Sequence, residues 1–229
     1  MESLNIDIES RDNNINENYS LWNNDDIWLE DGHEWSNFVG GTLNLWNDVI
    51  FPRIKKYLQG DVLEIAPGHG RITKYLLDFS TSLEIVDLSE NCIRACREKF
   101  GGKIKYNVTD GKSLQMIKSH SKDLVFSWDS FIHMHSSVID SYLNDICKIL
   151  KPTGYVILHH SYLQGGGEKS FDNIGGRSNM TPEHFKFLAE KNNLSIVDQE
   201  NIVNGGHVIH SYGNGQEGTS VDTISICRL

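Results

Sequence analysis

Short apolar runs alternate with longer amphipathic segments along most of the chain, and this alternation predicts its secondary structure. A strand that is buried on both faces of a parallel sheet gives an almost continuous apolar run, whereas a surface helix repeats its apolar positions with helical period. By this criterion the strands are residues 62–65, 82–87, 103–108, 123–127 and 155–159. Helices are predicted from residue 72 onward and over residues 90–100 and 138–150, and Ser89 is the expected cap of the second.

The last part of the chain breaks this alternation. Thr181-Pro182-Glu183 is typical of a helix start, with a capping hydroxyl, a proline at the first helical position and an acid behind it. Residues 194–203 and 222–228 then predict two strands with no helix between them. Five β/α alternations followed by such a pair predict an α/β fold: one mostly parallel, seven-stranded sheet with an antiparallel last strand and helices on both faces.

The part of the chain before the first strand is different in character. Residues 1–18 are rich in Asn, Asp and Glu, which predicts a flexible acidic arm. Residues 19–58 are expected to form a helical cover, although Pro52 should break or restart its last helix. The tryptophans of the cover favour two interpretations equally, namely short helices over a ligand-binding edge or a hydrophobic plug on the sheet. Residues 59–229 are predicted to form the main part of a single domain.

Two glycine-rich segments interrupt the second half of the chain. Residues 165–176 are long enough to form a mobile lid. Residues 204–220 are a polar excursion that carries His207 and His210. Arg177 follows the first segment and is a cation that could meet an anionic acceptor group, although a surface arginine is the simpler interpretation.

Composition narrows the possible functions. The formal net charge of −10 argues against a nucleic-acid partner, which needs a basic surface to neutralise phosphates. No apolar run approaches the ~20 residues that span a bilayer, and the polar N-terminus has no signal-peptide character. The cysteines have no C-x-x-C spacing, which predicts buried free thiols. We therefore expect a cytoplasmic protein without membrane insertion, and the sequence leaves the oligomeric state open.

The first predicted strand runs into a glycine turn, Ala66-Pro67-Gly68-His69-Gly70, and then into a helix. This order is typical of the first unit of a nucleotide-binding α/β domain, in which glycines let a ligand approach bare backbone. Asp87 ends the second strand, where a carboxylate can accept both hydroxyls of a ribose. The glycines alone would also fit a tight turn without a ligand, but Asp87 at this distance favours ribose binding.

Five motifs in this order resemble the class I S-adenosylmethionine-dependent methyltransferases, from about residue 30 to the end of the chain. They are the acid and glycines of 64–70, the acid at 87, Thr109-Asp110-Gly111, Ser127-Trp128-Asp129 and the turn at 150–154. Ala66 stands where the family has its first glycine. The resemblance implies a Rossmann-like class I fold and S-adenosylmethionine as cofactor. It assigns cofactor binding to Glu64, Ala66, Pro67, Gly68, Gly70, Arg71, Asp87, Leu88, Asp110, Gly111, Ser127 and Trp128.

Other proteins of related fold stay open as alternatives. A nicotinamide-dependent dehydrogenase would favour G-x-G-x-x-G, whereas position 73 is Thr. An aminopropyl transferase would need an acidic cluster for a polyamine, and the sequence has no clear one. A domain that keeps the cofactor pocket as a non-catalytic scaffold is the third alternative.

Histidines and an acid gather at the predicted ends of strands four and five. Methyl transfer is an in-line displacement, and a hydroxyl or amine acceptor also loses a proton to a base. The residues predicted for catalysis are Asp129, His133 and His160. Successive strand positions point to opposite faces, so at most one of His159 and His160 faces the site. Similar metal-assisted O-methyltransferases carry ligands at these strand ends, which leaves a second interpretation: Asp129, His133 and His159 or His160 bind a divalent metal ion.

The acceptor is the least defined part of the prediction. The strand-four motif lacks the Asn-Pro-Pro-Tyr pattern of base N-methyltransferases, and a short cover with a lid suits a small or sugar-sized acceptor. Three stretches resemble a bacterial methyltransferase subgroup that often accompanies surface-polysaccharide or natural-product pathways. They are Asp-Gly-His-Glu-Trp-Ser at 31–36, the turn Ala-Pro-Gly-His-Gly-Arg at 66–71 and the strand end His-His-Ser at 159–161. That resemblance implies O-methylation of a sugar or sugar-linked group, including a phosphoryl or phosphoramidate group on a capsule, or methylation of another natural product.

Overall fold

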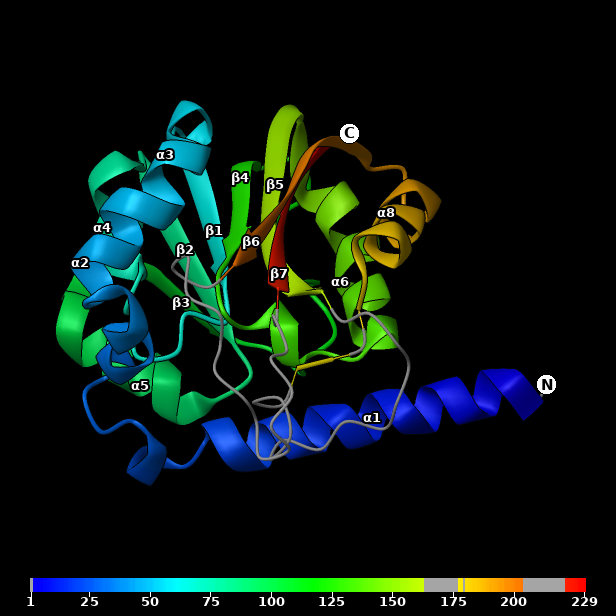
Figure 1. Ribbon diagram of the computed structural model, residues 1–229, viewed down its shortest axis with the longest axis horizontal. Helices are drawn as coiled ribbons and strands as arrows, with labels where there is room; N and C mark the ends of the chain where they lie inside the picture. Colours follow the sequence, from blue (N-terminus) through cyan, green and yellow to red (C-terminus); the bar gives the residue numbers. More distant parts are fainter. Residues whose placement is uncertain (1, 163–176, 179, 204–220) are drawn as a thin grey trace.

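A seven-stranded sheet runs through the centre of the molecule, with the strand order β3-β2-β1-β4-β5-β7-β6 (Figure 1). The structure is a computed structural model that describes residues 2–162, 177–178, 180–203 and 221–229. The predicted lid and the excursion with His207 and His210 lie outside the described residues. The strands are β1 (Asp61–Ile65), β2 (Ser82–Asp87), β3 (Lys105–Val108), β4 (Lys122–Ser127), β5 (Leu150–Tyr162), β6 (Ser195–Val203) and β7 (Val221–Arg228).

The pairing of the strands confirms the predicted topology. The strands β1 to β5 pair in parallel, and β7 lies antiparallel between β5 and β6. The chain moves outward from β1 to β3 and then returns to place β4 on the other side of β1. Such a reversal is a topological switch point, and ligands of open α/β sheets bind beyond the carboxyl ends of the strands at this point.

Helices cover both faces of the sheet, as expected (Figure 1). They include α4 (Thr73–Phe79), α5 (Glu90–Phe100), α6 (Ser136–Ile149) and α8 (Pro182–Lys191). The predicted caps are present: Ser89 Oγ accepts from the backbone N–H of Cys92, and Thr181 Oγ1 accepts from that of His184. Each cap satisfies a helix N–H that has no partner inside the helix.

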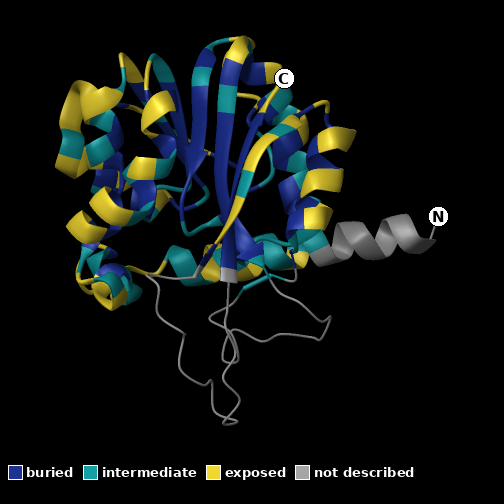
Figure 2. Ribbon diagram, turned by 45° about the horizontal axis from the view of Figure 1, so that its top comes forward, coloured by how far each residue is buried: buried dark blue, intermediate teal, exposed yellow. Residues whose placement is uncertain are grey.

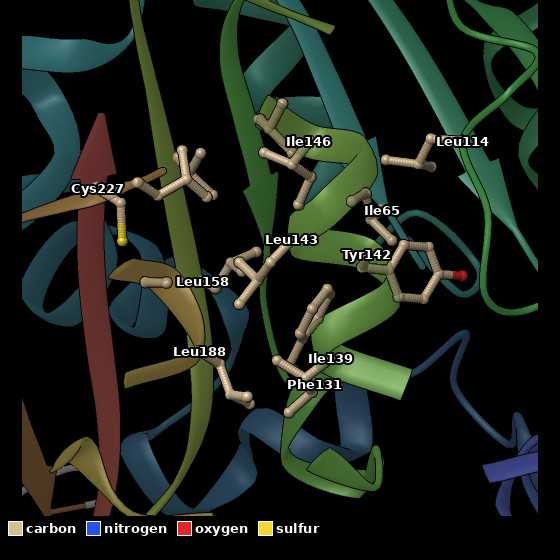
Figure 3. Packing of buried hydrophobic residues seen from close by; sticks show 14 of the residues in the cluster. Ile65, Leu114, Phe131, Ile139, Tyr142, Leu143, Ile146, Leu158, Leu188 and Cys227 are labelled. Atoms are coloured by element: carbon tan, nitrogen blue, oxygen red, sulfur yellow. The ribbon is translucent and has the colours of Figure 1, made fainter. Parts of the chain in front are cut away.

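Two hydrophobic clusters fill the space on either side of the sheet. Leu63 and Ile65 point into the cluster with α6 and α8, whereas Val62 points into the other cluster. This alternation follows from the period of two in a strand. Figure 3 shows Ile65 near Tyr142 and Leu143 of α6. Because both faces of the sheet are covered in this way, most of the sheet is buried, whereas the helices are partly exposed (Figure 2).

The N-terminal segment differs from the prediction of a flexible acidic arm, because Glu2–Trp22 forms one long helix, α1. The helix crosses one end of the sheet (Figure 1). Three of its apolar residues, Ile15, Tyr19 and Trp22, recur at helical spacing and line a cavity there. Asn14 adds a polar anchor, since its side chain donates to the carbonyl of His133 at 3.2 Å. These tertiary contacts stabilise a helix that its composition does not predict.

Pro52 lies in the first turn of α3, where the helix of the cover restarts, which is one of the two outcomes predicted for this proline. Helical turns continue from α2 (Thr42–Asn44) through a π-helical segment (Leu45–Ile50) into α3 (Phe51–Ile54). The wider π turn ends just before Pro52, so the missing N–H falls where the hydrogen-bond pattern changes in any case. A second difference is at 150–154, where the predicted turn is already part of β5 and pairs with β4 across a register shift.

Candidate functional site

A cavity of about 360 Å³ lies at the carboxyl ends of the strands, between the glycine turn and α1. The sheet side contributes the turn after β1, the ends of β2 and β3 and the segment after β4. The cover contributes aromatic side chains, including Trp22, Trp28 and Trp35. Trp46 instead packs against Tyr75 beside the sheet. Both interpretations of the tryptophans are therefore realised, by different members of the set.

The two glycines of the turn after β1 are needed for different reasons. Gly68 has a φ of +58°, and a Cβ there would lie 2.4 Å from the Trp28 ring, so an aromatic ring rests directly on its backbone. Gly70 has a φ of +79° and faces α5, where a Cβ would lie 2.5 Å from Phe100. Only Gly68 lines the cavity. Gly70 therefore allows close packing of the turn on α5, and Gly68 allows close packing of Trp28 on the turn at the wall of the cavity.

Asp87 lies beside Gly68 at the end of β2. Its carboxylate accepts from the backbone N–H of Gly68 at 3.1 Å and from that of Ser89 at 2.9 Å. Burial raises the pKa of Asp87 to about 6, and the backbone donors lower it only in part. A buried carboxylate at the wall of a cavity gains from further donors, such as the two hydroxyls of a ribose.

The residues assigned to cofactor binding separate into two groups. Those that line the cavity are Ala66, Pro67, Gly68, Arg71, Asp87, Leu88, Gly111 and Trp128. The others, Glu64, Gly70, Asp110 and Ser127, support the wall from behind: Glu64, for example, accepts from Thr73 Oγ1 at 2.6 Å, and burial raises its pKa to about 8. Asp110 accepts from two backbone N–H groups of its own loop and so shapes the turn around Gly111.

These side chains fit S-adenosylmethionine by the chemistry of their donors and acceptors. Asp87 can accept from the hydroxyls of the ribose. Around Gly111 the lining is apolar: a Cβ there would lie 2.9 Å from Ile15 and 3.1 Å from Leu88, so both side chains pack on the bare glycine. A buried acceptor beside an apolar lining matches the polarity of a ribose and its base.

Asp129 marks the opposite side of the cavity, after β4. Its φ is +59°, an uncommon conformation for a residue other than glycine. One carboxylate oxygen pairs with Arg71 Nη2, and the other lies 3.1 Å from Nδ1 of His159. Burial alone would raise the pKa of Asp129, but the Arg71 charge and the His159 side chain outweigh it and hold this pKa well below its usual range.

His159 lies behind Asp129 and is almost completely buried, at 1% exposure. Its ring stacks on Trp128 with centroids 4.1 Å apart, and its Nε2 lies 3.6 Å from Asp222 of β7. Burial would lower the pKa of His159, yet the two carboxylates raise it above its usual value. Asp222 in turn accepts two hydrogen bonds of 2.8 Å from Arg177. Sequence reasoning missed Asp222, because no motif connects β7 with the ends of β4 and β5.

The other two histidines of the prediction lie apart. His133 lines the cavity, with its ring 5.1 Å from that of Trp22. His160 points to the other face of the sheet, where its ring stacks on Phe185 at 4.2 Å and its Nε2 lies 2.8 Å from Ser225 Oγ. Burial lowers the pKa of His160 to about 3. The structure thus does not bring His160 to the cavity, since the strand turns His159 toward it instead.

The described part of the chain contains no group of three His, Cys, Asp or Glu side chains that could hold a metal ion. Asp129 is engaged by Arg71, and both ring nitrogens of His159 face carboxylates. His160 lies on the far side of the strand. The metal-binding interpretation therefore finds no support among these four residues.

The polar string of the cover, residues 31–36, folds over the same edge. Asp31 Oδ1 lies 3.0 Å from His69 Nδ1, and Trp28 stacks on the His69 ring with centroids 4.3 Å apart. Ser36 accepts from Arg71 Nη1 at 2.8 Å. The cover is therefore attached both to the glycine turn and to the arginine that pairs with Asp129.

The sheet order, with its antiparallel last strand, is that of the Rossmann-like fold of class I S-adenosylmethionine-dependent methyltransferases. Residues 62–154 match the sequence profile of a family described as a methyltransferase domain. This match runs from β1 to the start of β5 and includes Asp87 and Asp129. None of the helices in the described ranges is both long and apolar enough to cross a bilayer.

Among curated proteins, the chain is similar to the mitochondrial methyltransferase OMS1 of Saccharomyces cerevisiae. The two are 29% identical over 165 residues, which cover 61% of this chain and 34% of the relative. The chain is also similar to the ribosomal RNA small subunit methyltransferase A of Pseudomonas syringae, with 32% identity over 68 residues that cover 30% of this chain and 25% of the relative. The chain thus spans about a third or less of the length of these relatives.

Solved structures share the fold at low sequence identity. The S-adenosylmethionine-dependent methyltransferase from Mesorhizobium loti has a TM-score of 0.61 and 13% identity, and the match covers 80% of this chain and 100% of that one. The cyclase SpnF has a TM-score of 0.61 and 15% identity, with 88% and 82% coverage. Since one of these two neighbours is described as a cyclase, the fold by itself does not define the reaction.

Proposed function

We propose that this protein transfers the methyl group of S-adenosylmethionine to a hydroxyl of a small-molecule acceptor, and that the acceptor is a sugar or a sugar-linked group. One observation carries the proposal: a cavity with the Asp87 and Gly68 cradle on one wall and Asp129 and His133 on another. A transferase needs both walls, because the methyl donor and the acceptor have to meet in line.

The residues of the two walls have separate tasks in this reaction. When bound, S-adenosylmethionine supplies an electrophilic methyl group on a positively charged sulfonium. Asp87 holds the ribose, and the apolar side chains that pack at Gly111, those of Ile15 and Leu88, border the space for the adenine. Asp129 accepts a hydrogen bond from the acceptor hydroxyl and orients its oxygen toward the methyl group.

The low pKa of Asp129 is compatible with this role. A hydroxyl oxygen that bonds to a methyl group becomes positive, and its proton becomes strongly acidic as the bond forms. A weakly basic carboxylate is then sufficient to take that proton, so no strong base is required before the transfer. His133 lines the same cavity and is the second residue within the site that could receive the proton.

The charges around the acceptor edge favour an uncharged acceptor group. Arg71 pairs with Asp129, and Arg177 pairs with Asp222, so each of these cations already has a carboxylate. A phosphoryl or phosphoramidate group would have to compete with those carboxylates, whereas a neutral sugar hydroxyl would not. A role in surface-polysaccharide synthesis rests only on the resemblance of the stretches at 31–36, 66–71 and 159–161.

The test is an acceptor panel with S-adenosylhomocysteine as the measured product. The panel contains neutral sugars, nucleotide-linked sugars, sugar phosphates and a short RNA, since one of the relatives is described as a ribosomal RNA methyltransferase. We expect turnover with a neutral or nucleotide-linked sugar. Turnover with RNA alone would contradict the proposed acceptor, although the methyl transfer would stand.

A second possibility is a protein that binds the cofactor without methyl transfer. This possibility is supported by the structural neighbour SpnF, which is described as a cyclase and shares the fold at a TM-score of 0.61. Binding of S-adenosylmethionine together with no product across the whole panel would support it.

A further inference from the structure

Asp222 and Arg177 form a buried ion pair next to the proposed acceptor edge. Asp222 is completely buried, at 0% exposure. Its Oδ1 accepts from Arg177 Nε at 2.8 Å and its Oδ2 accepts from Arg177 Nη2 at 2.8 Å. A buried carboxylate costs several kcal/mol unless it is paired, and bidentate arginine pairing fixes its orientation. The pair is therefore a rigid part of the interior. The proposed methyl transfer gives neither of its two residues a role.

His159 lies between this pair and Asp129. Its Nε2 lies 3.6 Å from Asp222 Oδ2, an ion-pair distance, and makes no hydrogen bond within the described ranges. Its Nδ1 faces Asp129 in two ways, at 3.1 Å from Oδ1 and at 3.2 Å from the backbone N–H. The stacked ring of Trp128 prevents the imidazole from leaving this plane.

The two contacts at Nδ1 correspond to two protonation states of the ring. A neutral imidazole has one N–H and one lone pair. If the proton is on Nε2, it points at Asp222, and Nδ1 accepts from the backbone N–H of Asp129. If both nitrogens are protonated, Nδ1 donates to Oδ1 of Asp129 instead. In both states Nε2 keeps its proton toward Asp222, so the carboxylate selects the tautomer.

We propose that Asp222 and Arg177 are positioning residues, which hold His159 through Nε2 and thereby aim its Nδ1 at Asp129. The inference rests on the proposed function, in which Asp129 orients the acceptor. Asp129 then has two holders, Arg71 on one oxygen and His159 on the other. Its uncommon positive φ means that the backbone alone does not favour this orientation, so the holders keep it in place.

The surroundings of His159 support a charged ring at neutral pH. The groups that face it are the carboxylates of Asp129 and Asp222, with Arg71 and Arg177 behind them. His160, the next residue, points to the opposite face of the sheet. Positive and negative charges thus alternate from Arg71 to Arg177, which pairs each buried charge with one of opposite sign.

The test is a nitrogen-15 spectrum of the histidine side chains in the full chain, recorded between pH 6 and pH 9. The His159 signals are assigned by their disappearance in His159→Gln. In the unmodified protein we expect protonated Nε2 over the whole range. A ring that carries its proton on Nδ1 and has a bare Nε2 would overturn the proposal, and this result needs no further variant.

Asp222→Asn removes the charge that faces Nε2. We expect the pKa of His159 to fall by about one unit or more, because an opposite charge at this distance is lost. We also expect kcat to fall by about tenfold or more with an acceptor found in the panel, with the Kd for S-adenosylmethionine unchanged within about twofold. Arg177→Lys, which keeps the charge but not the fork, should cause a smaller change of the same sign.

The matched control is Asp140→Asn. Like Asp222, Asp140 accepts two side-chain hydrogen bonds, in its case from Lys191 and Asn192. It lies on α6 outside the cavity. An unchanged His159 spectrum in Asp222→Asn, or an equal change in Asp140→Asn, would contradict the positioning role. A protein that gives the expected His159 spectrum but binds no S-adenosylmethionine would instead contradict the proposed function.

Discussion

The two walls of the cavity are built in different ways. The cofactor wall, at the ends of β1, β2 and β3, consists of tight turns and short side chains, with Gly68 and Asp87 hydrogen-bonded to each other. The acceptor wall, at the ends of β4, β5 and β7, consists of long charged side chains that hold one another, with Asp129 and His159 at the centre. One wall depends on backbone shape and the other on paired charges.

This difference predicts different responses to mutation. If the proposed function is right, a change in the cofactor wall should alter the affinity for S-adenosylmethionine, because the proposal places the cofactor against that wall before and during the transfer. A change in the acceptor wall should alter kcat, because its charges act on the acceptor oxygen during the transfer. Variants in the two walls therefore test whether cofactor affinity and kcat depend on different walls.

The largest effect is expected for Asp129→Asn. Asparagine keeps the shape of the side chain and loses the negative charge that orients the acceptor and takes its proton. We expect kcat to fall by roughly 10²–10⁴-fold, the range for loss of a catalytic base, as measured by the rate of S-adenosylhomocysteine formation. A loss of less than about threefold would remove Asp129 from the reaction and leave His133 as the base.

The next largest effect is expected for Glu64→Gln, in the cofactor wall, and it changes the free energy of unfolding. Burial raises the pKa of Glu64 to about 8 from an ordinary value of 4.5. The folded state therefore binds this proton more tightly than the unfolded state, and the associated stability is present at low pH and lost as pH rises toward 8. In Glu64→Gln the side chain stays neutral. The variant should therefore gain roughly 3 kcal/mol relative to the unmodified protein between pH 5 and pH 8.

Urea unfolding at pH 5, 6.5 and 8 measures this difference. The comparison of the two proteins at each pH cancels the contributions of the other ionisable groups. A difference in unfolding free energy that does not change with pH would show that Glu64 is ionised in the folded protein, and that the acid of the first motif has a different role from the structural one inferred here.

A smaller effect is expected for Asp87→Ala. The variant loses the acceptor for the ribose hydroxyls, and hydrogen bonds to a charged group contribute about 1.5–3 kcal/mol each. We expect the Kd for S-adenosylmethionine to rise by roughly 10–100-fold in a calorimetric titration. Asp78→Ala is the matched control, since Asp78 is exposed on α4 and does not line the cavity. If the two variants bind S-adenosylmethionine with equal affinity, Asp87 does not contact the cofactor.

The smallest effect is expected for Ala66→Gly. Ala66 has a φ of +54°, a conformation that costs an L-residue about 1–2 kcal/mol, whereas glycine adopts it freely. Part of this gain is offset by the greater freedom of glycine in the unfolded chain, so we expect about 0.5–1 kcal/mol of added stability. Thermal unfolding measures it, and a lower Tm would indicate that the methyl group of Ala66 packs usefully in the turn.

The comparison of the walls also shows how much could be predicted from the sequence. The strands and the helix caps could be predicted because each depends on residues near one another in the chain, such as Ser89 and the N–H of Cys92 that it caps. The arrangement of the acceptor wall depends on contacts between distant segments, for example His159 of β5 with Asp222 of β7. No local pattern reports such a contact.

The prediction for α1 failed for a related reason. Its composition favours a flexible arm, and the helix forms because Ile15, Tyr19 and Trp22 face the cavity and Asn14 is anchored to the segment after β4. His160 was predicted at the site because the sequence leaves the strand register open by one residue, and a shift of one residue reverses the face. The register of a strand and the contacts that hold α1 are set only when the chain folds, so no local sequence pattern predicts them.

The most direct test of the division between the walls is one calorimetric series with S-adenosylmethionine and three proteins: unmodified, Asp87→Ala and Asp129→Asn. We predict that the unmodified protein and Asp129→Asn bind one equivalent with Kd values within about threefold of each other, and that Asp87→Ala binds at least about tenfold more weakly. Absence of binding to the unmodified protein, or an equal loss in both variants, would contradict this account.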